Sequence, residues 1–321
     1  MTENSTNGMV VMLGTGGTIA GTAARPDDRH AYTAAQLGVD ELIQSVAPLR
    51  EALGAHRLVT EQVAQLDSKD MDWATWQALA GRCDHWLGDP AVQALVITHG
   101  TDTIEETACF LQLVLQPRKP VVLVCAMRPA TALAPDGPQN LLDAVTVALE
   151  PAASGVMVVC AGVVHDALRV QKVHPYRLDA FDSGVDGPLG FIEQGQVWWG
   201  RVASPVAEAL SAVPSVQAVC QASLPPWVEI VLSHQGADGR LVDALVRDGV
   251  QGLVVAGTGN GTVHQALHVA LLRAQAAGVR VVRATRCAYG RVLPGAGDEL
   301  PDSRGLSPVK ARVAMMLSLL K

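Results

Sequence analysis

Two loops rich in threonine and glycine carry the side chains best suited to chemistry. Residues 14–21 read Gly-Thr-Gly-Gly-Thr-Ile-Ala-Gly, and residues 98–107 read Thr-His-Gly-Thr-Asp-Thr-Ile-Glu-Glu-Thr. Glycine lets the backbone approach a ligand closely, and the second loop gathers hydroxyls, a carboxylate and the free amides of a helix start. We therefore expect this region to hold a small zwitterion.

A threonine hydroxyl is a weak nucleophile that needs a neighbouring base, and a lysine amine can act as one. Lys172 lies in residues 169–172, which we expect to form an extended hairpin, and it could act together with Thr101 and Asp102. The alternative for each residue is structural, because Asp102 also suits a helix N-cap and Lys172 a surface position.

Thr18 and Tyr32 are the other two candidates, and Thr18 could equally cap a helix. Tyr32 belongs to the polar stretch 22–33, which includes Pro26, Asp27 and Asp28 and is predicted to be a flexible flap that closes over a substrate. Its hydroxyl could carry a proton, or the side chain could simply lie on the surface.

Neither loop is a nucleotide-binding motif. A Gly-x-Gly-x-x-Gly match from Gly14 fails at Ile19, one from Gly257 fails at Thr262, and no Gly-Lys-Ser/Thr follows either loop. His264 and His268 form the closest histidine pair, and their spacing fits an exposed helical face better than a metal site. We expect no cofactor and no metal.

Short apolar runs alternate with amphipathic stretches, which predicts buried parallel strands separated by helices. The predicted strands are residues 10–13, 94–98, 121–125 and 155–160, then 227–232, 253–256 and 279–284; helices are predicted at 70–86, 105–115 and 308–320. The predicted fold is α/β, with a larger N-terminal parallel-sheet domain at 1–190 and a smaller C-terminal doubly wound domain at 226–321. Residues 191–225 lack a sustained period and are predicted to be a connector.

The composition indicates small partners. The net charge of −7 argues against nucleic acid and anionic lipid, and no apolar run is long enough for a membrane span. An apolar content of 49% favours packed layers and contacts between subunits. We expect a cytoplasmic protein, because residues 1–8 are polar without an export signal and the cysteines are dispersed like reduced core thiols.

Both loops resemble the signature regions of the asparaginase family of two-domain amidohydrolases, and the resemblance covers nearly the whole chain. Further stretches agree with it: Met127-Arg128-Pro129, Asp136-Gly137-Pro138-Gln139-Asn140-Leu141, Gly257-Thr258-Gly259-Asn260-Gly261 and Pro308-Val309-Lys310-Ala311-Arg312. The resemblance implies hydrolysis of L-asparagine to L-aspartate and ammonia without a cofactor. It also implies a homotetramer built from close dimers.

The same resemblance assigns roles to residues. Thr18 would be the nucleophile with Tyr32 beside it, and Thr101, Lys172 and Asp102 would form a second unit opposite. Ser68 and Asp102 would hold the α-carboxylate and α-amino groups of the substrate. Gly17 and Gly100 in the two loops, with Lys69 and Asn260, complete the predicted binding residues.

Two positions depart from the family pattern. Many relatives carry glutamine where this chain has Lys69, whose ammonium cannot accept a hydrogen bond from a substrate amine. We therefore predict that Lys69→Gln lowers KM for asparagine. Exported relatives also place an acidic residue in the C-terminal domain that reaches a neighbouring subunit, and only Asp298 and Glu299 are available here.

Three other functions compete with this hypothesis. A glutaminase-asparaginase differs by one methylene of substrate, worth about 1–3 kcal/mol in a pocket. The related subunit of a tRNA-dependent amidotransferase is disfavoured by the acidic charge. A non-catalytic amino-acid sensor is disfavoured because hydroxyl, lysine and carboxylate are all retained.

Overall fold

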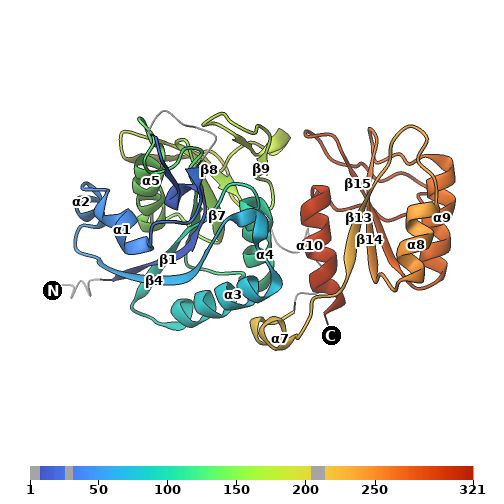
Figure 1. Cartoon of the computed structure of the whole chain (residues 1–321), viewed down its shortest axis with the longest axis horizontal. Helices are drawn as coiled ribbons and strands as arrows, with labels where there is room; N and C mark the ends of the chain where they lie inside the picture. Colours follow the sequence, from blue (N-terminus) through green and yellow to red (C-terminus); the bar gives the residue numbers. More distant parts are fainter. Residues whose placement is uncertain (1–7, 26–31, 204–213, 321) are drawn as a thin grey trace. The chain divides into compact units, whose positions relative to one another are not determined.

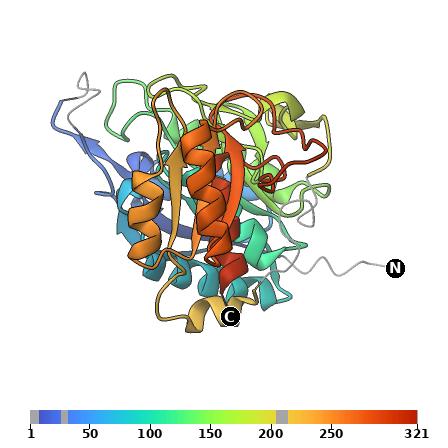
Figure 2. The same cartoon turned by 90° about the vertical axis from the view of Figure 1, so that its right-hand side faces the viewer.

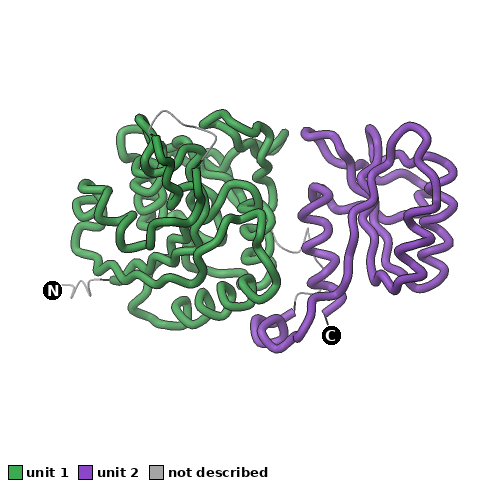
Figure 3. The backbone as a smooth tube through the Cα atoms, viewed as in Figure 1, with its two compact units in different colours: residues 1–204 green, residues 205–321 purple. Residues whose placement is uncertain are grey.

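The computed structural model describes residues 8–25, 32–203 and 214–320 and divides into two compact units, residues 1–204 and 205–321 (Figure 3). The first unit is built on an eight-stranded sheet (Figure 1). In sheet order its strands are β12 (Gln196–Trp199), β11 (Gly190–Glu193), β8 (Val163–Asp166), β7 (Val156–Cys160), β6 (Val121–Val124), β5 (Val92–Thr98), β1 (Met9–Gly16) and β4 (Arg57–Leu66).

Five strands of this sheet, from β4 to β7, run parallel. Helices cover both faces, so β1, β6 and β7 are buried along their whole length. Helices α1 (Val39–Gln44), α2 (Leu49–Leu53) and α5 (Gly137–Leu149) lie on one side of the sheet, and α3 (Trp73–Gly88) and α4 (Ile104–Leu115) on the other (Figure 1). The predicted α/β fold is confirmed, with a sheet that is mixed rather than wholly parallel.

Part of the antiparallel side of the sheet lies where the sequence predicted a connector. β8, β11 and β12 are antiparallel, so residues 190–199 form a hairpin of the first unit instead of the start of a connector. Each hairpin strand has four residues, which is too short to show a clear period. The helix α7 (Val216–Gln221) follows later in the predicted connector.

The helix starts also differ from the prediction by a few residues. α3 begins at Trp73 rather than at residue 70, because the Asp72 side chain accepts from Thr75 N at 2.8 Å and caps it. Thr103 precedes α4 but makes no capping bond, since its hydroxyl donates to Ser68 O at 2.7 Å. The sequence thus places these helices correctly but not the hydrogen bonds that begin them.

The second unit is a three-stranded parallel sheet in the order β13 (Val228–Leu232), β14 (Gly252–Gly257) and β15 (Arg280–Thr285). Helices α8 (Arg240–Arg247) and α9 (Gln265–Ala276) cover one face, which Figure 2 shows in front of the sheet. Helix α10 (Pro308–Leu319) packs on the opposite face, as a doubly wound arrangement requires.

Two features bear on the predicted environment of the chain. Among the described residues, no helix has the length and apolarity that a bilayer crossing demands. The cysteines are thiols rather than disulfides: Cys83, Cys109, Cys125 and Cys160 are buried as expected, whereas Cys220 and Cys287 are exposed. The prediction of core thiols is therefore wrong for the last two.

Candidate active site

The two threonine-rich loops leave the carboxyl ends of neighbouring parallel strands. β1 ends at Gly16 and β5 ends at Thr98, with Gly14 paired to Thr98 in the sheet. The Thr15 hydroxyl donates to Thr98 O at 2.7 Å and ties the loops together where they begin. Because ligands of open parallel sheets bind beyond the carboxyl ends of the strands, these loops lie where a site is expected.

The loops cross at Gly17 and Gly100 with almost no space between their backbones. A Cβ on Gly17 would lie 2.3 Å from Gly100 Cα, and Gly17 has φ +83°. A Cβ on Gly100 would in turn lie 2.4 Å from Ser68 Oγ. Only glycine fits at either position, so the crossing fixes the loop of Thr18 against the loop of Thr101.

Thr18 begins the short 3-10 helix η1 (Thr18–Ala20) directly after this crossing and is buried. Its hydroxyl lies 2.8 Å from the Tyr32 hydroxyl. Tyr32 is in β3 (Tyr32–Thr33), which pairs with β2 (Thr22–Ala23) in a small hairpin. The predicted flap includes Pro26, Asp27 and Asp28, which lie outside the described residues, so only the base of that segment is placed.

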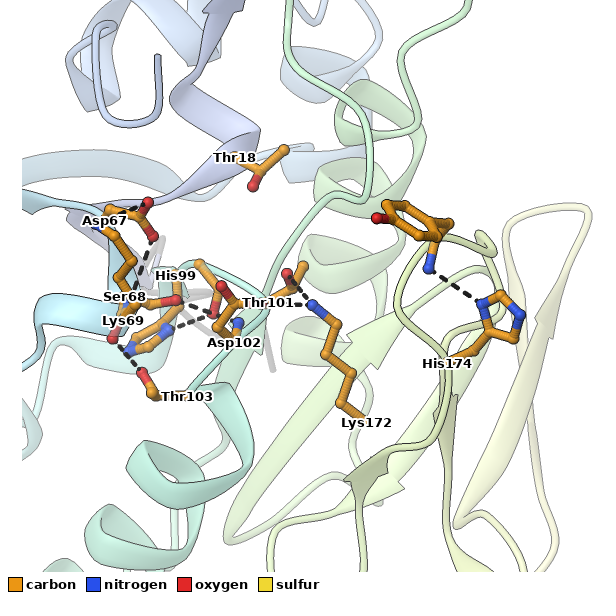
Figure 4. Close-up of polar contacts among 12 residues, drawn as sticks. Thr18, Asp67, Ser68, Lys69, His99, Thr101, Asp102, Thr103, Lys172 and His174 are labelled. Atoms are coloured by element: carbon orange, nitrogen blue, oxygen red, sulfur yellow. Dashed lines mark hydrogen bonds and ion pairs between the residues drawn. The ribbon is translucent and has the colours of Figure 1, made fainter. Parts of the chain in front are cut away.

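Thr101, Asp102 and Lys172 form the second group. Lys172 Nζ donates to Thr101 Oγ1 at 2.8 Å and to Asp102 Oδ1 at 2.6 Å (Figure 4). Lys172 lies in β9 (Gln171–Lys172), which pairs with β10 (Phe181–Asp182), so the expected extended hairpin is present. In Figure 4, Thr18 stands apart from this hydrogen-bonded group and is not joined to it by any drawn bond.

Ser68 holds the second loop from the side of β4. It follows that strand in the 3-10 helix η2 (Ser68–Asp70) and is 2% exposed. Ser68 Oγ accepts from Asp102 N at 3.2 Å, and Ser68 O accepts from the Thr103 hydroxyl at 2.7 Å. The serine predicted to bind substrate therefore lies against both Gly100 and Asp102.

His99 is a site residue that sequence reasoning did not single out. Its Nδ1 must donate to Gly100 O at 2.8 Å, because a carbonyl only accepts. Burial lowers the pKa of His99 to about 4, so the ring is neutral near pH 7. Its Nε2 is buried without a hydrogen-bond partner among the described residues. The available signal was its position inside a loop between Thr98 and Gly100.

Lys69 lies beside Ser68 but points to carboxylates of its own segment. Its Nζ is 2.6 Å from Asp70 Oδ2 and 3.3 Å from Asp67 Oδ2, and its side chain is 60% exposed. Hydrogen bonding to Asp70 raises the pKa of Lys69 above its usual value. Because Asp67 and Asp70 balance its charge, Lys69 should repel a substrate ammonium less than an unpaired lysine would. We therefore expect Lys69→Gln to lower KM by less than it would if the lysine were unpaired.

Three predicted polar residues of the second unit have partners within that unit. Asn260 accepts from Leu293 N at 2.7 Å and donates to Leu293 O at 3.0 Å, so both ends of its amide bind the backbone. Asp298 pairs with Arg283, and Glu299 Oε2 lies 3.1 Å from His268 Nε2. In the described part of the chain, no three His, Cys, Asp or Glu side chains form a group suited to a metal.

Comparison with protein families assigns both parts of the chain to one family. Residues 9–204 match the model described as "Asparaginase, N-terminal", and residues 227–321 match "Glutaminase/Asparaginase C-terminal domain". The chain belongs to the asparaginase family. It is accordingly an L-asparaginase-type amidohydrolase, as the two loops predicted.

Several relatives are similar over almost the full length. L-asparaginase 2 of Bacillus subtilis (strain 168) is 36% identical, with 97% of this chain and 82% of the relative covered. The glutaminase-asparaginase of Pseudomonas fluorescens biotype A is 35% identical, with 97% and 86% covered. A crystal structure of a probable cytoplasmic L-asparaginase from Campylobacter jejuni has a TM-score of 0.89 at 36% identity, covering 98% of this chain and 95% of that one.

Proposed function

We propose that the chain hydrolyses L-asparagine to L-aspartate and ammonia through an acyl-enzyme on Thr18. The observation that carries this proposal is the pair of threonine groups held on the crossing at Gly17 and Gly100. One threonine contacts a tyrosine hydroxyl, and the other contacts the Lys172 amine. This arrangement provides a nucleophile and two groups that can transfer protons, all positioned by the crossing of the two loops.

In the proposed reaction, Thr18 Oγ attacks the side-chain carbonyl carbon and gives up its proton to the neighbouring groups, with Tyr32 closest. The tetrahedral oxyanion is stabilised by backbone amides of the two loops, at roughly 3–4 kcal/mol for each donor. Ammonia then leaves with a proton and an ester remains. Water, activated from the side of Thr101 and Lys172, hydrolyses the ester to aspartate and restores the hydroxyl.

The second group also suits recognition of the amino acid. The Asp102 carboxylate is half-exposed next to Lys172 and can accept a hydrogen bond from an α-ammonium. Ser68 lies against Gly100 in the same site, where its hydroxyl can bind the α-carboxylate. Lys69 lies beside Ser68, and we retain it only as a residue that shapes the binding site. The role of Asn260 in binding stays a prediction, because its amide is bonded to Leu293 within the second unit.

The main alternative is a glutaminase-asparaginase of broader specificity. Relatives that are called L-asparaginase 2 and relatives that are called glutaminase-asparaginase have nearly the same identity to this chain, 36% and 35%. The family matches therefore do not distinguish asparagine from glutamine as the substrate. Any preference must come from how closely the pocket fits the one extra methylene of glutamine.

We also propose a cytoplasmic homotetramer built from close dimers. Buried thiols and the lack of disulfides fit a reducing compartment, and the Campylobacter jejuni protein is called cytoplasmic. A relative from Haemophilus influenzae is called periplasmic, so cell fractionation of the native host is the direct test of the compartment.

The decisive experiment measures ammonia release from L-asparagine, L-glutamine, their D-isomers and amides that lack the α-amino group. We expect L-asparagine to have the highest kcat/KM. A higher value for L-glutamine would favour the alternative, and no release from any amide would favour a sensor. Thr18→Ala and Thr101→Ala should each remove most turnover and keep the urea midpoint close to that of the wild type, since each deletes one hydroxyl and one methyl group rather than a large core side chain.

A further inference from the structure

The segment that follows β6 contacts the hairpin that carries Tyr32. Thr131 Oγ1 accepts from Ala23 N at 2.8 Å, and Ala130 N donates to Gly21 O at 2.9 Å. Thr131 Oγ1 also lies 3.4 Å from Ala23 O, to which it can donate weakly. Residues 130–131 thus bind the backbone at Gly21, just before β2, and at Ala23 within β2, although they are far from this strand in sequence.

These bonds reach Tyr32 through short connections. Ala23 is the strand partner of Tyr32 in the hairpin, so anchoring Ala23 anchors the residue opposite Tyr32. A Cβ on Gly21 would lie 3.0 Å from Tyr32 Cδ2, which places the tyrosine ring directly over Gly21. The two backbone positions that segment 130–131 holds are therefore the two positions that seat the Tyr32 ring.

The supporting segment is itself well fixed. Asp136 accepts from Met127 N and Arg128 N, both at 2.9 Å, and thereby closes the loop that contains Thr131. A Cβ on Gly137 would lie 3.0 Å from the Ile19 side chain, so the end of this loop packs against η1. One loop therefore contacts both the helix of Thr18 and the hairpin of Tyr32.

From these contacts we infer that Thr131 is a positioning residue for the reaction. Its hydroxyl holds β2 so that the Tyr32 hydroxyl stays within hydrogen-bond distance of Thr18. The Thr131 hydroxyl is bonded to the Ala23 backbone rather than to Thr18 or Tyr32, so its effect passes through the hairpin to Tyr32. The inference rests on the proposed function in one respect, namely that Tyr32 assists Thr18.

The test uses Thr131→Val, Thr131→Ser, Tyr32→Phe and the double variant Thr131→Val/Tyr32→Phe, assayed by ammonia release from L-asparagine. Valine keeps the shape and removes the hydroxyl, so we expect kcat to fall roughly 3- to 10-fold, with KM changed less. Serine should restore kcat. In the Tyr32→Phe background, Thr131→Val should add almost nothing, because the group that it positions is already gone.

The matched control is Thr146→Val. Thr146 is partly buried on α5 and its hydroxyl donates to Leu142 O within the helix, so kcat and the urea midpoint should stay near wild type. Wild-type kcat in Thr131→Val, or an equal fold loss in both tyrosine backgrounds, would overturn the inference alone. Wild-type kcat in Tyr32→Phe would reject the proposed role of Tyr32 and this inference with it. Loss of activity in Thr18→Ala is independent of both outcomes.

Discussion

Lys172 contacts both the Thr101 hydroxyl and the Asp102 carboxylate. Replacing it tests whether its amine serves proton transfer, which affects kcat, or substrate binding, which affects KM. Lys172→Met keeps the length of the side chain but removes the amine that contacts Thr101 and Asp102. We expect kcat to fall by roughly 100-fold or more, while KM stays measurable, because the lost interaction acts in the transition state. Steady-state kinetics with L-asparagine measure both values.

Lys119→Met is the matched control for this variant. Lys119 Nζ binds Leu87 O and Asp89 O at 2.9 and 2.7 Å, at the far end of the strands from the site. It should lower stability slightly and leave kcat unchanged. An unchanged kcat in Lys172→Met would show that another group serves as the base.

His99 gives a prediction about pH and stability. The ring stays neutral in the folded chain until its pKa of about 4, whereas the unfolded chain binds the proton near pH 6.5. The unfolded state therefore binds more protons between these values, and stability falls as the pH is lowered from 6.5 to 4, by up to about 3 kcal/mol.

Urea unfolding at several pH values measures this effect, with His99→Gln as the comparison because glutamine can still donate to Gly100 O. Other titrating groups are shared by both proteins, so the difference between the two pH profiles belongs to His99. We expect a shallower loss of stability in the variant between pH 6.5 and 4. Parallel profiles would mean that His99 is protonated equally in both states.

At the scale of the elements, the crossing of the two loops can be tested by a pair of glycines with nearly the same backbone angles. Gly17 has φ 83° and ψ −172°, and Gly187 has φ 71° and ψ 172°. A Cβ on Gly17 meets the Gly100 backbone, whereas nothing lies within 4 Å of a Cβ on Gly187. The two positions thus share backbone strain but differ in space.

We expect Gly187→Ala to lower the free energy of unfolding by about 2 kcal/mol, from strain alone, and to keep kcat. Gly17→Ala should be less stable still and should lose most activity, since the loops of Thr18 and Thr101 must move apart. Urea midpoints and ammonia release measure both effects. Equal stability and equal activity of the two variants would show that the crossing is loose.

The sequence predicts buried elements well and half-exposed ones poorly. β1, β5, β6 and β7 follow apolar runs and lie within a few residues of the predicted strands. β4 was not predicted, because half of its ten residues are polar and none is fully buried. Edge strands lack the continuous apolar pattern that burial on both faces of a sheet produces.

The candidate site shows the same division. The resemblance of the two loops to the asparaginase signature regions predicted that Thr18 and Thr101 would share a site, and the structure places Lys172 beside Thr101. The partners of Lys69 and Asn260 were not predictable, because they depend on side-chain directions that a loop sequence does not determine. His99 and Thr131 are hydrogen-bonded to backbone groups, and such bonds leave no pattern in the side-chain types.

At the scale of the whole molecule, the cysteines report on how each unit is covered. Burial raises the pKa of the Cys83 thiol, and a hydrogen bond with Cys160, together with burial, raises the pKa of Cys125. We expect an alkylating reagent to label Cys220 and Cys287 in the native protein and all six cysteines after denaturation. Peptide mass spectrometry gives the sites; native labelling of Cys83 or Cys125 would contradict the described packing.

The position of β1 in its sheet has a consequence for how the chain is made. Val10 pairs with Leu58 on one side and with Ala94 on the other, so both neighbours of this apolar strand are synthesised long after it. Until β4 has been made, residues 9–13 have two unpaired edges, and one edge stays unpaired until β5 leaves the ribosome. Parallel sheets of such non-local pairing form slowly and expose surfaces that aggregate. Expression at lower temperature or with more chaperone should therefore raise the yield of native protein, because the nascent chain must be protected until β5 has been made.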